Sequence, residues 1–440
     1  MARTRFRGPA LLTTLLVSLG GLTVATAPAD AAGPGVVRSD GPHLHAWWYD
    51  AMRIPAAHRV TEGAGARVAV IDNGFHASDP GLRGADVHLM GNCFGNEDPD
   101  EPLGDASAHG TEMALLLAGN GRAAGGRPGF LGIAPRARID LWNASPVPYC
   151  DDKQEQAMAL AAARSGADII SISLQLTGDW TATLEKISSY GTVVVAAAGN
   201  RPDGDTAIIS PAKFRGVVAV NAIDRNADAW KGNTTVSQPM LDHGSGYPAM
   251  SAPGVDIPSY GWSKQTGWTK GRATGTSNST AIVAGALALV KSQYPSATGN
   301  QLIQHLIHYS GGTGPFRWDP YYGFGVASVT KMLAHDPTQW PDENPLLLTP
   351  EQVVATYPMS VRHPASTASN APAADPGTDS GSTTARSTSS GVPVVVWVAL
   401  VVLVLAGAAA AVTLTRRRRV TAVEPARAAV QQSDTEKQGV

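Results

Sequence analysis

Three side chains in this sequence could together perform nucleophilic chemistry: Asp72, His109 and Ser277. A serine hydroxyl becomes a nucleophile when an imidazole takes its proton, and a carboxylate can hold that imidazole in the required tautomer. Each residue alone has an ordinary explanation, because Asp-Asn-Gly is a common turn and a histidine or serine can simply begin a helix. Together, in the order Asp, His, Ser, they supply the side chains that acyl transfer by a serine requires.

The flanking segments predict that each of these residues lies at the end of a secondary-structure element. Asp72 directly follows the β-branched run 67–71, which is typical of a buried strand. His109 begins a helical segment, and Ser277 precedes a long Ala/Val/Leu run with helical spacing. In the first turn of a helix, unpaired backbone N–H groups and the positive end of the dipole favour developing negative charge. A capped core helix remains the alternative explanation for the serine.

Strand and helix patterns alternate along the middle of the chain. Further strands are predicted at 137–143, 167–174, 192–198 and 216–223, and further helices at 151–165, 180–190 and 300–309. This alternation predicts an α/β fold in which helices cover both faces of a mainly parallel sheet. Ligands of such sheets bind at the carboxyl ends of the strands, and the three reactive residues are predicted to lie there.

Three motifs resemble the signatures of the subtilisin-like serine proteases, or subtilases. They are Val68-Ala69-Val70-Ile71-Asp72-Asn73-Gly74, His109-Gly110-Thr111 and Gly275-Thr276-Ser277. The resemblance covers roughly 47–333 and implies a three-layer subtilisin-like fold with serine endopeptidase activity on polypeptides. It assigns the catalytic triad to Asp72, His109 and Ser277. We predict no cofactor and no metal-binding residues, and no Cys/His spacing indicates a structural zinc site.

Other stretches carry the same resemblance. Ala196-Ala197-Ala198-Gly199-Asn200 is similar to the stretch whose asparagine completes the family's oxyanion hole, which implies that role for Asn200. The family's cis-proline turn is matched by 210–212 and its Ala-Pro-Gly loop by 251–254. The substrate-binding strand corresponds to Ser173, Leu174 and Gln175. Because Gln175 replaces a glycine that usually lets the substrate backbone approach, the depth of the pocket before the cut is an open question.

Three further positions depart from the family pattern. Glu112 stands where a second histidine is usual, Asn73 where Ser or Thr is commoner, and Ala281 where a proline follows the nucleophile. Neither Glu112 nor Asn73 occupies a position that takes part in proton transfer, so we expect activity to survive these changes.

Both ends of the chain depart from globular composition. Residues 1–31 combine a basic start, a short apolar run and a small-x-small site, which is typical of a secretory signal peptide. A buried N-terminal helix is the alternative. Residues 393–415 are apolar and uncharged, and as a helix they are long enough to cross a bilayer. The arginines at 416–419 should stay cytoplasmic. The sequence therefore predicts a single-pass protein of the cell membrane with an extracytoplasmic catalytic domain.

The predicted organisation follows from these features. It comprises a signal peptide (1–31), an N-terminal extension (32–66), a catalytic domain (67–357), a flexible linker (358–392), a transmembrane helix (393–415) and a cytoplasmic tail (416–440). In an exported domain, Cys93 and Cys150 are expected to form a disulfide, the alternative being two buried thiols. The acidic run 97–101 is predicted to be a solvated loop, with a calcium site as the alternative.

The composition also limits the partners of the chain. The formal net charge of −2 predicts no particular attraction to nucleic acid. The predicted anchor, the N-terminal extension and the departures from the subtilase pattern resemble the mycosins, which are membrane-anchored subtilases associated with type VII secretion. That resemblance implies processing of type VII substrates and a secretion complex as partner. The alternative is a non-catalytic or weakly catalytic scaffold. An esterase is disfavoured because Gly-x-Ser-x-Gly is absent and the triad order differs.

Overall fold

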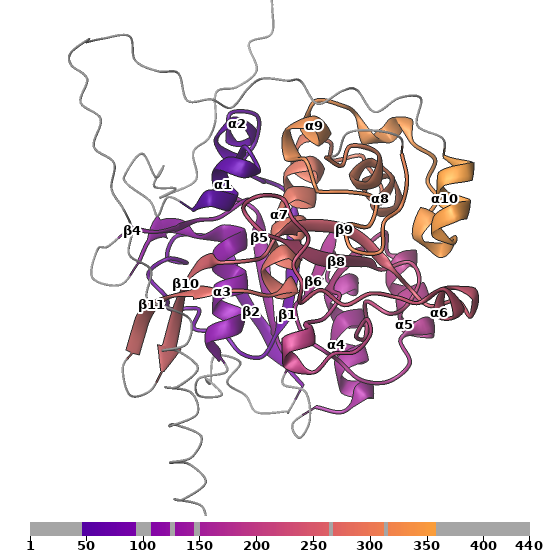
Figure 1. Cartoon of the computed structure of the whole chain (residues 1–440). Coiled ribbons are helices and arrows are strands. Elements are labelled where there is room, and N and C mark those ends of the chain that lie inside the picture. The colour runs from indigo at the N-terminus through magenta and orange to yellow at the C-terminus, as the bar shows by residue number, and fades with distance from the viewer. Residues whose placement is uncertain are drawn as a thin grey trace, which may run out of the picture. The chain divides into compact units, whose positions relative to one another are not determined.

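A seven-stranded parallel sheet forms the centre of the protein in the computed structural model (Figure 1), which describes residues 46–93, 107–123, 128–144, 150–263, 267–311 and 316–357. The predicted signal peptide, linker, transmembrane helix and tail lie outside these residues, as does the acidic run 97–101. Among the described residues, no helix has both the length and the apolar character that crossing a bilayer requires.

The sheet confirms the predicted parallel α/β fold. Its strands, in spatial order, are β2 (Val87–Asn92), β5 (Arg138–Asn143), β1 (Arg67–Asp72), β6 (Ile169–Ile172), β7 (Val193–Ala197), β8 (Val218–Ile223) and β9 (Pro248–Pro253). Every neighbouring pair is parallel. All residues of β6, β7, β8 and β9 are buried, as expected of strands that are covered on both faces. The edge strand β2 is only half-buried, and its weaker apolar pattern left it unpredicted.

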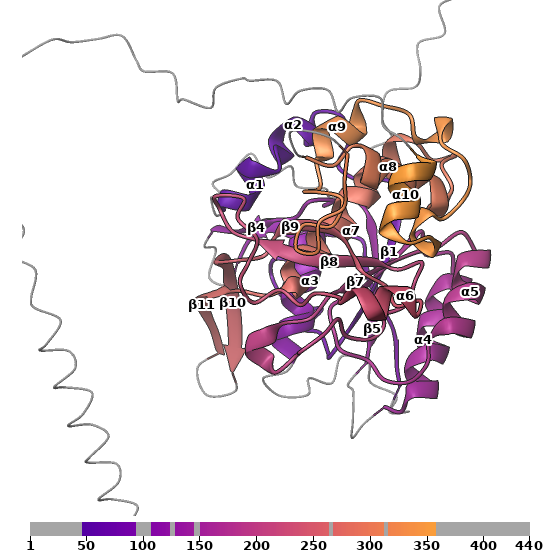
Figure 2. The same ribbon diagram turned by 45° about the vertical axis from the view of Figure 1, so that its right-hand side comes forward.

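Helices form a layer on each side of this sheet (Figures 1 and 2). One layer contains α3 (Ser107–Ala118) and α7 (Thr276–Gln293), which contact each other and the central strands. The other contains α4 (Asp152–Arg164) and α5 (Thr181–Ser189). The approach of α7 depends on Gly285, because a Cβ there would lie only 2.9 Å from the side chain of Ile133 and 3.4 Å from that of Leu117. The helix that carries Ser277 therefore packs closely against α3 and the segment that contains Ile133.

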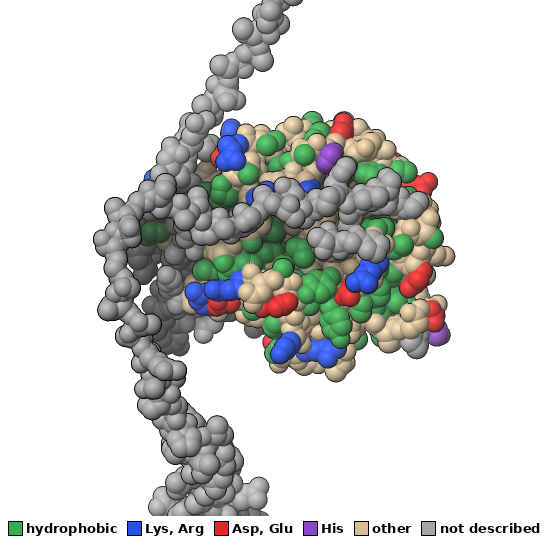
Figure 3. All heavy atoms as spheres, turned by 45° about the horizontal axis from the view of Figure 1, so that its top comes forward, with side chains coloured by type: hydrophobic (Ala, Val, Ile, Leu, Met, Phe, Trp, Pro, Cys, Tyr) green, Lys and Arg blue, Asp and Glu red, His purple; other side chains and the backbone are tan. Residues whose placement is uncertain are grey.

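Smaller elements surround these three layers. They are α1 (Trp47–Ala51), α2 (Ile54–His58), β3 (Asn120–Arg122), β4 (Pro128–Leu131), η3 (Arg201–Asp203), α6 (Gln238–Asp242), β10 (Ile257–Ser263), β11 (Gly267–Ala273), α8 (Gly299–His308), α9 (Val329–Leu333), η4 (Pro337–Gln339), η5 (Pro345–Leu347) and α10 (Pro350–Thr356). Trp48 and Ile54, from the segment assigned to the N-terminal extension, belong to the same hydrophobic core as the sheet. The antiparallel hairpin β10–β11 lies beside α3 (Figure 1). On the face shown in Figure 3, acidic and basic side chains are interspersed.

Helix α8 carries two buried histidines in an aromatic cluster. His305 donates from Nε2 to the Met332 carbonyl oxygen (2.8 Å) and accepts from Trp340 Nε1 at Nδ1 (3.0 Å), which suits only the neutral imidazole. The His308 ring stacks on Trp340, with 4.0 Å between centroids, and neither ring nitrogen has a hydrogen-bond partner among the described residues. Burial accordingly lowers the pKa of both histidines to about 4.

We expect acid to destabilise the fold through this cluster. An unfolded imidazole binds protons below its usual pKa of about 6.5, whereas the folded ones resist protonation down to about 4. The contribution of these neutral histidines to the free energy of unfolding is therefore fully present above the pKa of the unfolded state. It is lost as the pH falls, by ~2 kcal/mol per histidine at pH 5. His308→Phe keeps the stacking and removes the titration. Chemical denaturation at pH 7 and pH 5 should show a smaller loss for this variant than for the wild type.

Val60→Ala, an exposed substitution that changes no titratable group, supplies the control for this comparison. It should follow the wild-type dependence of the unfolding free energy on pH. Equal losses in the His308→Phe and Val60→Ala variants would show that the buried cluster does not set the acid sensitivity.

Candidate active site

The carboxyl ends of β1, β6 and β7 meet the amino ends of α3 and α7 at a cleft of about 400 Å³. The cleft is lined by Asn73, His109, Glu112, Met113, Ser173, Leu174, Gln175, Ala197, Asn200, Asp203, Asp205, Ile209, Ala273, Thr274, Gly275, Thr276, Ser277 and Asn278. Residues that lie more than a hundred positions apart in the chain thus meet at one edge of the sheet.

Asp72 is the last residue of β1, and its side chain is fully buried. Its Oδ1 accepts hydrogen bonds from the Asn73 backbone N–H (2.8 Å) and from His109 Nδ1 (2.7 Å). The close approach of α3 requires Gly110, because a Cβ at this position would collide with the Gly74 carbonyl oxygen. The His-Gly pair therefore brings the imidazole within hydrogen-bonding distance of a carboxylate at the strand end.

His109 lies in the first turn of α3, two residues after the helix begins, with its side chain about one third exposed. Because Nδ1–H donates to Asp72, Nε2 is the nitrogen left to exchange a proton with a second group. Burial by itself lowers the pKa of His109. The charge of Asp72, its hydrogen bond to the imidazole, and the charges of Glu112 and Asp203 together outweigh this effect, so the pKa of His109 lies above its usual value.

Ser277 is the second residue of α7, and two hydrogen bonds tie it to the end of β6. Its Oγ donates to the Ser173 carbonyl oxygen (3.2 Å), while Ser173 Oγ donates to the Ser277 carbonyl oxygen (3.1 Å). Among the described residues, Ser277 Oγ bonds to Ser173 rather than to His109. Catalytic hydrogen bonds of this kind often tighten only when substrate is bound.

Asn200 follows β7 and faces the start of α7. Its Oδ1 accepts from the Thr276 backbone N–H (2.9 Å) and from Thr276 Oγ1 (3.0 Å). The amide is therefore oriented with Nδ2 as the available donor, and Nδ2 now donates to Asp203 Oδ2 (2.9 Å). An amide N–H beside a helix N-terminus is an arrangement that can hold an oxyanion.

The structure brings together every residue for which a catalytic, oxyanion or substrate-binding role was predicted. Gln175 lines the cleft beside Ser173 and Leu174, so the residue that replaces the family glycine is available to a bound substrate. The chain also places carboxylates of Glu112, Asp203 and Asp205 there, which the sequence analysis did not assign to the site. The signal for Glu112 was its spacing of three residues from His109, which puts both on one helix face.

The predicted disulfide between Cys93 and Cys150 is present. It links the residue that follows β2 to the segment that precedes α4, and the Cys93 backbone N–H donates to the Asn143 carbonyl oxygen (3.3 Å). The cross-link thus fastens the edge of the sheet. The peptide bond between Ser210 and Pro211 is cis, as the family resemblance implied.

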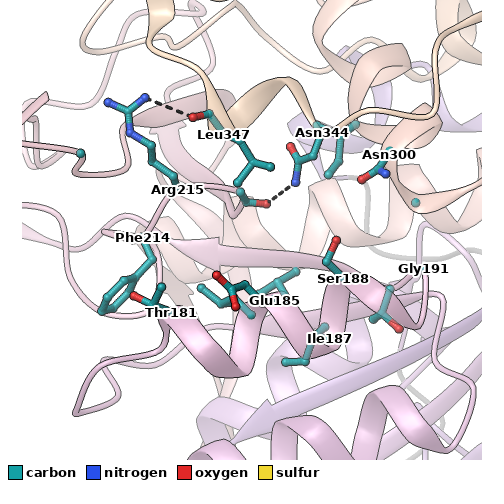
Figure 4. Close-up of a pocket in the computed structure, with 17 residues that line it drawn as sticks. Thr181, Glu185, Ile187, Ser188, Gly191, Phe214, Arg215, Asn300, Asn344 and Leu347 are labelled. Carbon is teal, nitrogen blue, oxygen red and sulfur yellow. Dashed lines mark hydrogen bonds between the residues drawn. The ribbon is translucent and has the colours of Figure 1, made fainter. Parts of the chain in front are cut away.

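A second cavity, of about 380 Å³, lies near the amino ends of β7 and β8 (Figure 4). It is lined by Thr181, Leu184, Glu185, Ile187, Ser188, Gly191, Thr192, Val194, Phe214, Arg215, Gly216, Gly244, Gly299, Asn300, Ile303, Asn344 and Leu347. Asn344 and Leu347 lie on one side of the opening and Glu185 and Ser188 on the other. No histidine is among the described residues that line this cavity, so it lacks the pairing of serine and histidine that the first cleft contains.

A family profile and several known proteins match this chain. The profile of the "Subtilase family" matches residues 63–325. The thermostable alkaline protease of Halalkalibacterium halodurans is 34% identical over 271 residues, which cover 59% of this chain and 66% of that protein. Subtilisin Savinase of Lederbergia lenta is 32% identical over 291 residues, which cover 64% of this chain and 96% of that protein.

Two solved structures extend the comparison. MycP1 with its N-terminal propeptide removed is 26% identical and superposes with a TM-score of 0.55, covering 68% of this chain and all (100%) of that one. The MycP3 protease from the type VII (ESX-3) secretion system is 25% identical, with a TM-score of 0.51 and coverage of 66% of this chain and 88% of that one.

The electrostatics of the cleft predict a change that can be measured without any substrate. Asp72→Asn removes a charge that raises the pKa of His109, so this pKa should fall. An NMR titration of the imidazole resonances of isotopically labelled protein would measure it. Glu185→Gln, which removes an exposed carboxylate from the second cavity, should leave the titration of His109 unchanged. A pKa of His109 that is the same in the Asp72→Asn variant and the wild type would contradict the described pairing.

Proposed function

The chain belongs to the subtilase family and is a serine endopeptidase, and we propose that Asp72, His109 and Ser277 are its catalytic triad. The hydrogen bond between Asp72 Oδ1 and His109 Nδ1, in a cleft that also contains Ser277, carries this proposal. That bond fixes the tautomer in which Nε2 can accept a proton. The serine stands at a helix N-terminus, where negative charge is stabilised.

In the proposed reaction, His109 Nε2 takes the proton of Ser277 Oγ as the oxygen attacks the carbonyl carbon of the scissile peptide bond. The resulting oxyanion accepts hydrogen bonds from Asn200 Nδ2 and the Ser277 backbone N–H. His109 then gives its proton to the leaving amine, and the C–N bond breaks to leave an acyl-enzyme. Water, deprotonated by His109, releases the acid product and regenerates Ser277. Asp72 stays ionised throughout and stabilises the imidazolium.

Two bonds in the resting cleft must change for this reaction to proceed. Ser277 Oγ must leave the Ser173 carbonyl oxygen, and Asn200 Nδ2 must exchange Asp203 for the oxyanion. Binding of the substrate would supply the competing partners, because it expels water and strengthens polar interactions inside the cleft. Loss of the Asn200 donor should then reduce kcat by about 10²–10³.

For the biological setting, we propose a membrane-anchored peptidase that processes substrates of type VII secretion outside the cytoplasm. Two observations support this setting. The chain is similar to the MycP3 protease from a type VII secretion system, and its sequence predicts a signal peptide and the span 393–415. A secretion complex in the same membrane is the partner that this setting implies.

A scaffold of a secretion complex is the second candidate function. The observation that favours it is the resting state of the cleft, where Ser277 Oγ and Asn200 Nδ2 bond to Ser173 and Asp203. A scaffold, however, does not require a histidine held by a buried carboxylate. If no peptide of a diverse library is cleaved by the purified full chain, the scaffold is favoured.

Covalent labelling tests the proposed nucleophile. An organophosphonate probe should label the wild-type chain, since an activated serine attacks phosphorus as it attacks a carbonyl. Ser277→Ala should lose all labelling while its thermal unfolding stays close to that of the wild type. The matched control is Ser188→Ala, which removes an exposed hydroxyl from the second cavity and should label normally. Persistent labelling of Ser277→Ala would defeat the assignment.

The proposed setting has its own test. Cells that express wild-type or Ser277→Ala chains are compared by N-terminal proteomics of their secreted proteins. New N-termini that appear only with the wild type would identify the substrates. Identical sets of N-termini would exclude processing of secreted proteins by this site.

A further inference from the structure

The charges around the cleft are of one sign. Three carboxylates line it, from Glu112, Asp203 and Asp205, and no lysine or arginine is among its described lining residues. Asp72 lies beneath His109 and adds a fourth negative charge. Among the lining residues that the structure describes, His109 is therefore the only one that can carry a positive charge. A cleft with this excess of negative charge attracts cations and repels anions.

Glu112 is a half-buried carboxylate of the cleft. It lies one helical turn after His109 on α3, and it accepts a hydrogen bond from the Ser259 hydroxyl of β10. Among the described residues, no lysine or arginine forms an ion pair with it. Burial raises the pKa of Glu112, while the hydrogen bond from Ser259 and the charge of His109 oppose this rise. A half-buried carboxylate without a cationic partner carries a desolvation cost that a cationic ligand would offset.

The two other carboxylates differ in what holds them. Asp205 Oδ2 accepts from the Asn200 backbone N–H (2.7 Å), a bond that does not depend on the state of the cleft. Asp203 Oδ2 accepts from Asn200 Nδ2, the donor that the proposed mechanism assigns to the oxyanion. When that donor turns to the substrate, Asp203 is left without it. Asp203 is exposed, so an incoming side chain can reach it.

We propose that Glu112, assisted by Asp203, makes the cleft select polypeptides that carry lysine or arginine close to the scissile bond. The inference rests on the proposed peptidase function and names the substrate class of the same site. Glu112 acts here as a specificity-determining residue. The substrate cation supplies the partner that Glu112 lacks, and at Asp203 it replaces the Asn200 amide that moves to the oxyanion. His109, one turn before Glu112, is about one third exposed, so this part of the cleft is open to an incoming side chain.

A second explanation for the same carboxylates makes a different prediction. Glu112 and Asp203 raise the pKa of His109, and they could serve this purpose alone. In that case, removing one of them would shift the acid limb of the pH profile equally for all substrates. The ranking of substrates would not change. Only a change in the ranking supports the inference.

The experiment measures kcat/KM for peptide sets that differ at one position near the cut, which carries Lys, Arg, Gln or Glu. The full chain is used in detergent, at a pH where kcat/KM no longer changes with pH. The variants are Glu112→Gln, which keeps an oxygen to accept from Ser259, and Asp203→Asn. Glu185→Gln, outside the cleft, is the control. Phosphonate labelling is measured on the same samples.

For the wild type, we expect at least one position at which Lys or Arg is cleaved ~10–100 times faster than Gln, with Glu slowest. Glu112→Gln should lose most of this ratio and Asp203→Asn a smaller part, whereas Glu185→Gln should keep it. A wild type that labels but shows no preference for cations, or a ratio unchanged in both cleft variants, would overturn the inference alone. A wild type that neither labels nor cleaves would overturn the proposed function. Because Asp203 is exposed, its variant provides the test if Glu112→Gln does not fold.

Discussion

The hydrogen bond between the buried Asp72 carboxylate and His109 is the interaction on which the rest of the site depends. A carboxylate without exposed surface is tolerated only when donors replace its water, and here the imidazole and the Asn73 backbone N–H are two of them. This requirement sets the geometry of two elements. β1 must end at Asp72, and α3 must approach closely enough for its third residue to reach the carboxylate, which Gly110 allows. The proton-accepting nitrogen is then the one that faces the cleft.

The sequence predicted the parts of the molecule in which local pattern and tertiary environment agree. The buried strands are continuous apolar runs, so β1, β6, β7 and β8 were identified, and the small residues before α7 marked the start of the nucleophile helix. The edge strand β2 was missed, because a half-buried strand has no such run. The buried strand β9 was also missed, since it begins and ends with proline. The hairpin β10–β11 was missed because proline and glycines interrupt its strand pattern.

The acidic character of the cleft could not be predicted for a related reason. Glu112 meets Ser259 across 147 positions, and no local pattern encodes that contact. Asp203 reaches Asn200 because the short turn η3 brings it back toward the amide, and three-residue helices have no periodicity to read. The aromatic stack around His308 likewise joins α8 to the distant segment that contains Trp340. The motifs identified the side chains that we propose are catalytic, whereas the contacts of the charges that surround them came from the fold.

The central claim, that these separated side chains converge on one reacting centre, is tested most directly by a crystal structure of the protein after reaction with a peptidyl phosphonate. The account predicts phosphorus bonded to Ser277 Oγ, one phosphoryl oxygen within hydrogen-bonding distance of Asn200 Nδ2, and His109 Nε2 adjacent to the adduct with Nδ1 still bonded to Asp72. An adduct on another residue, or an adduct on Ser277 with the imidazole turned away from it, would contradict the account.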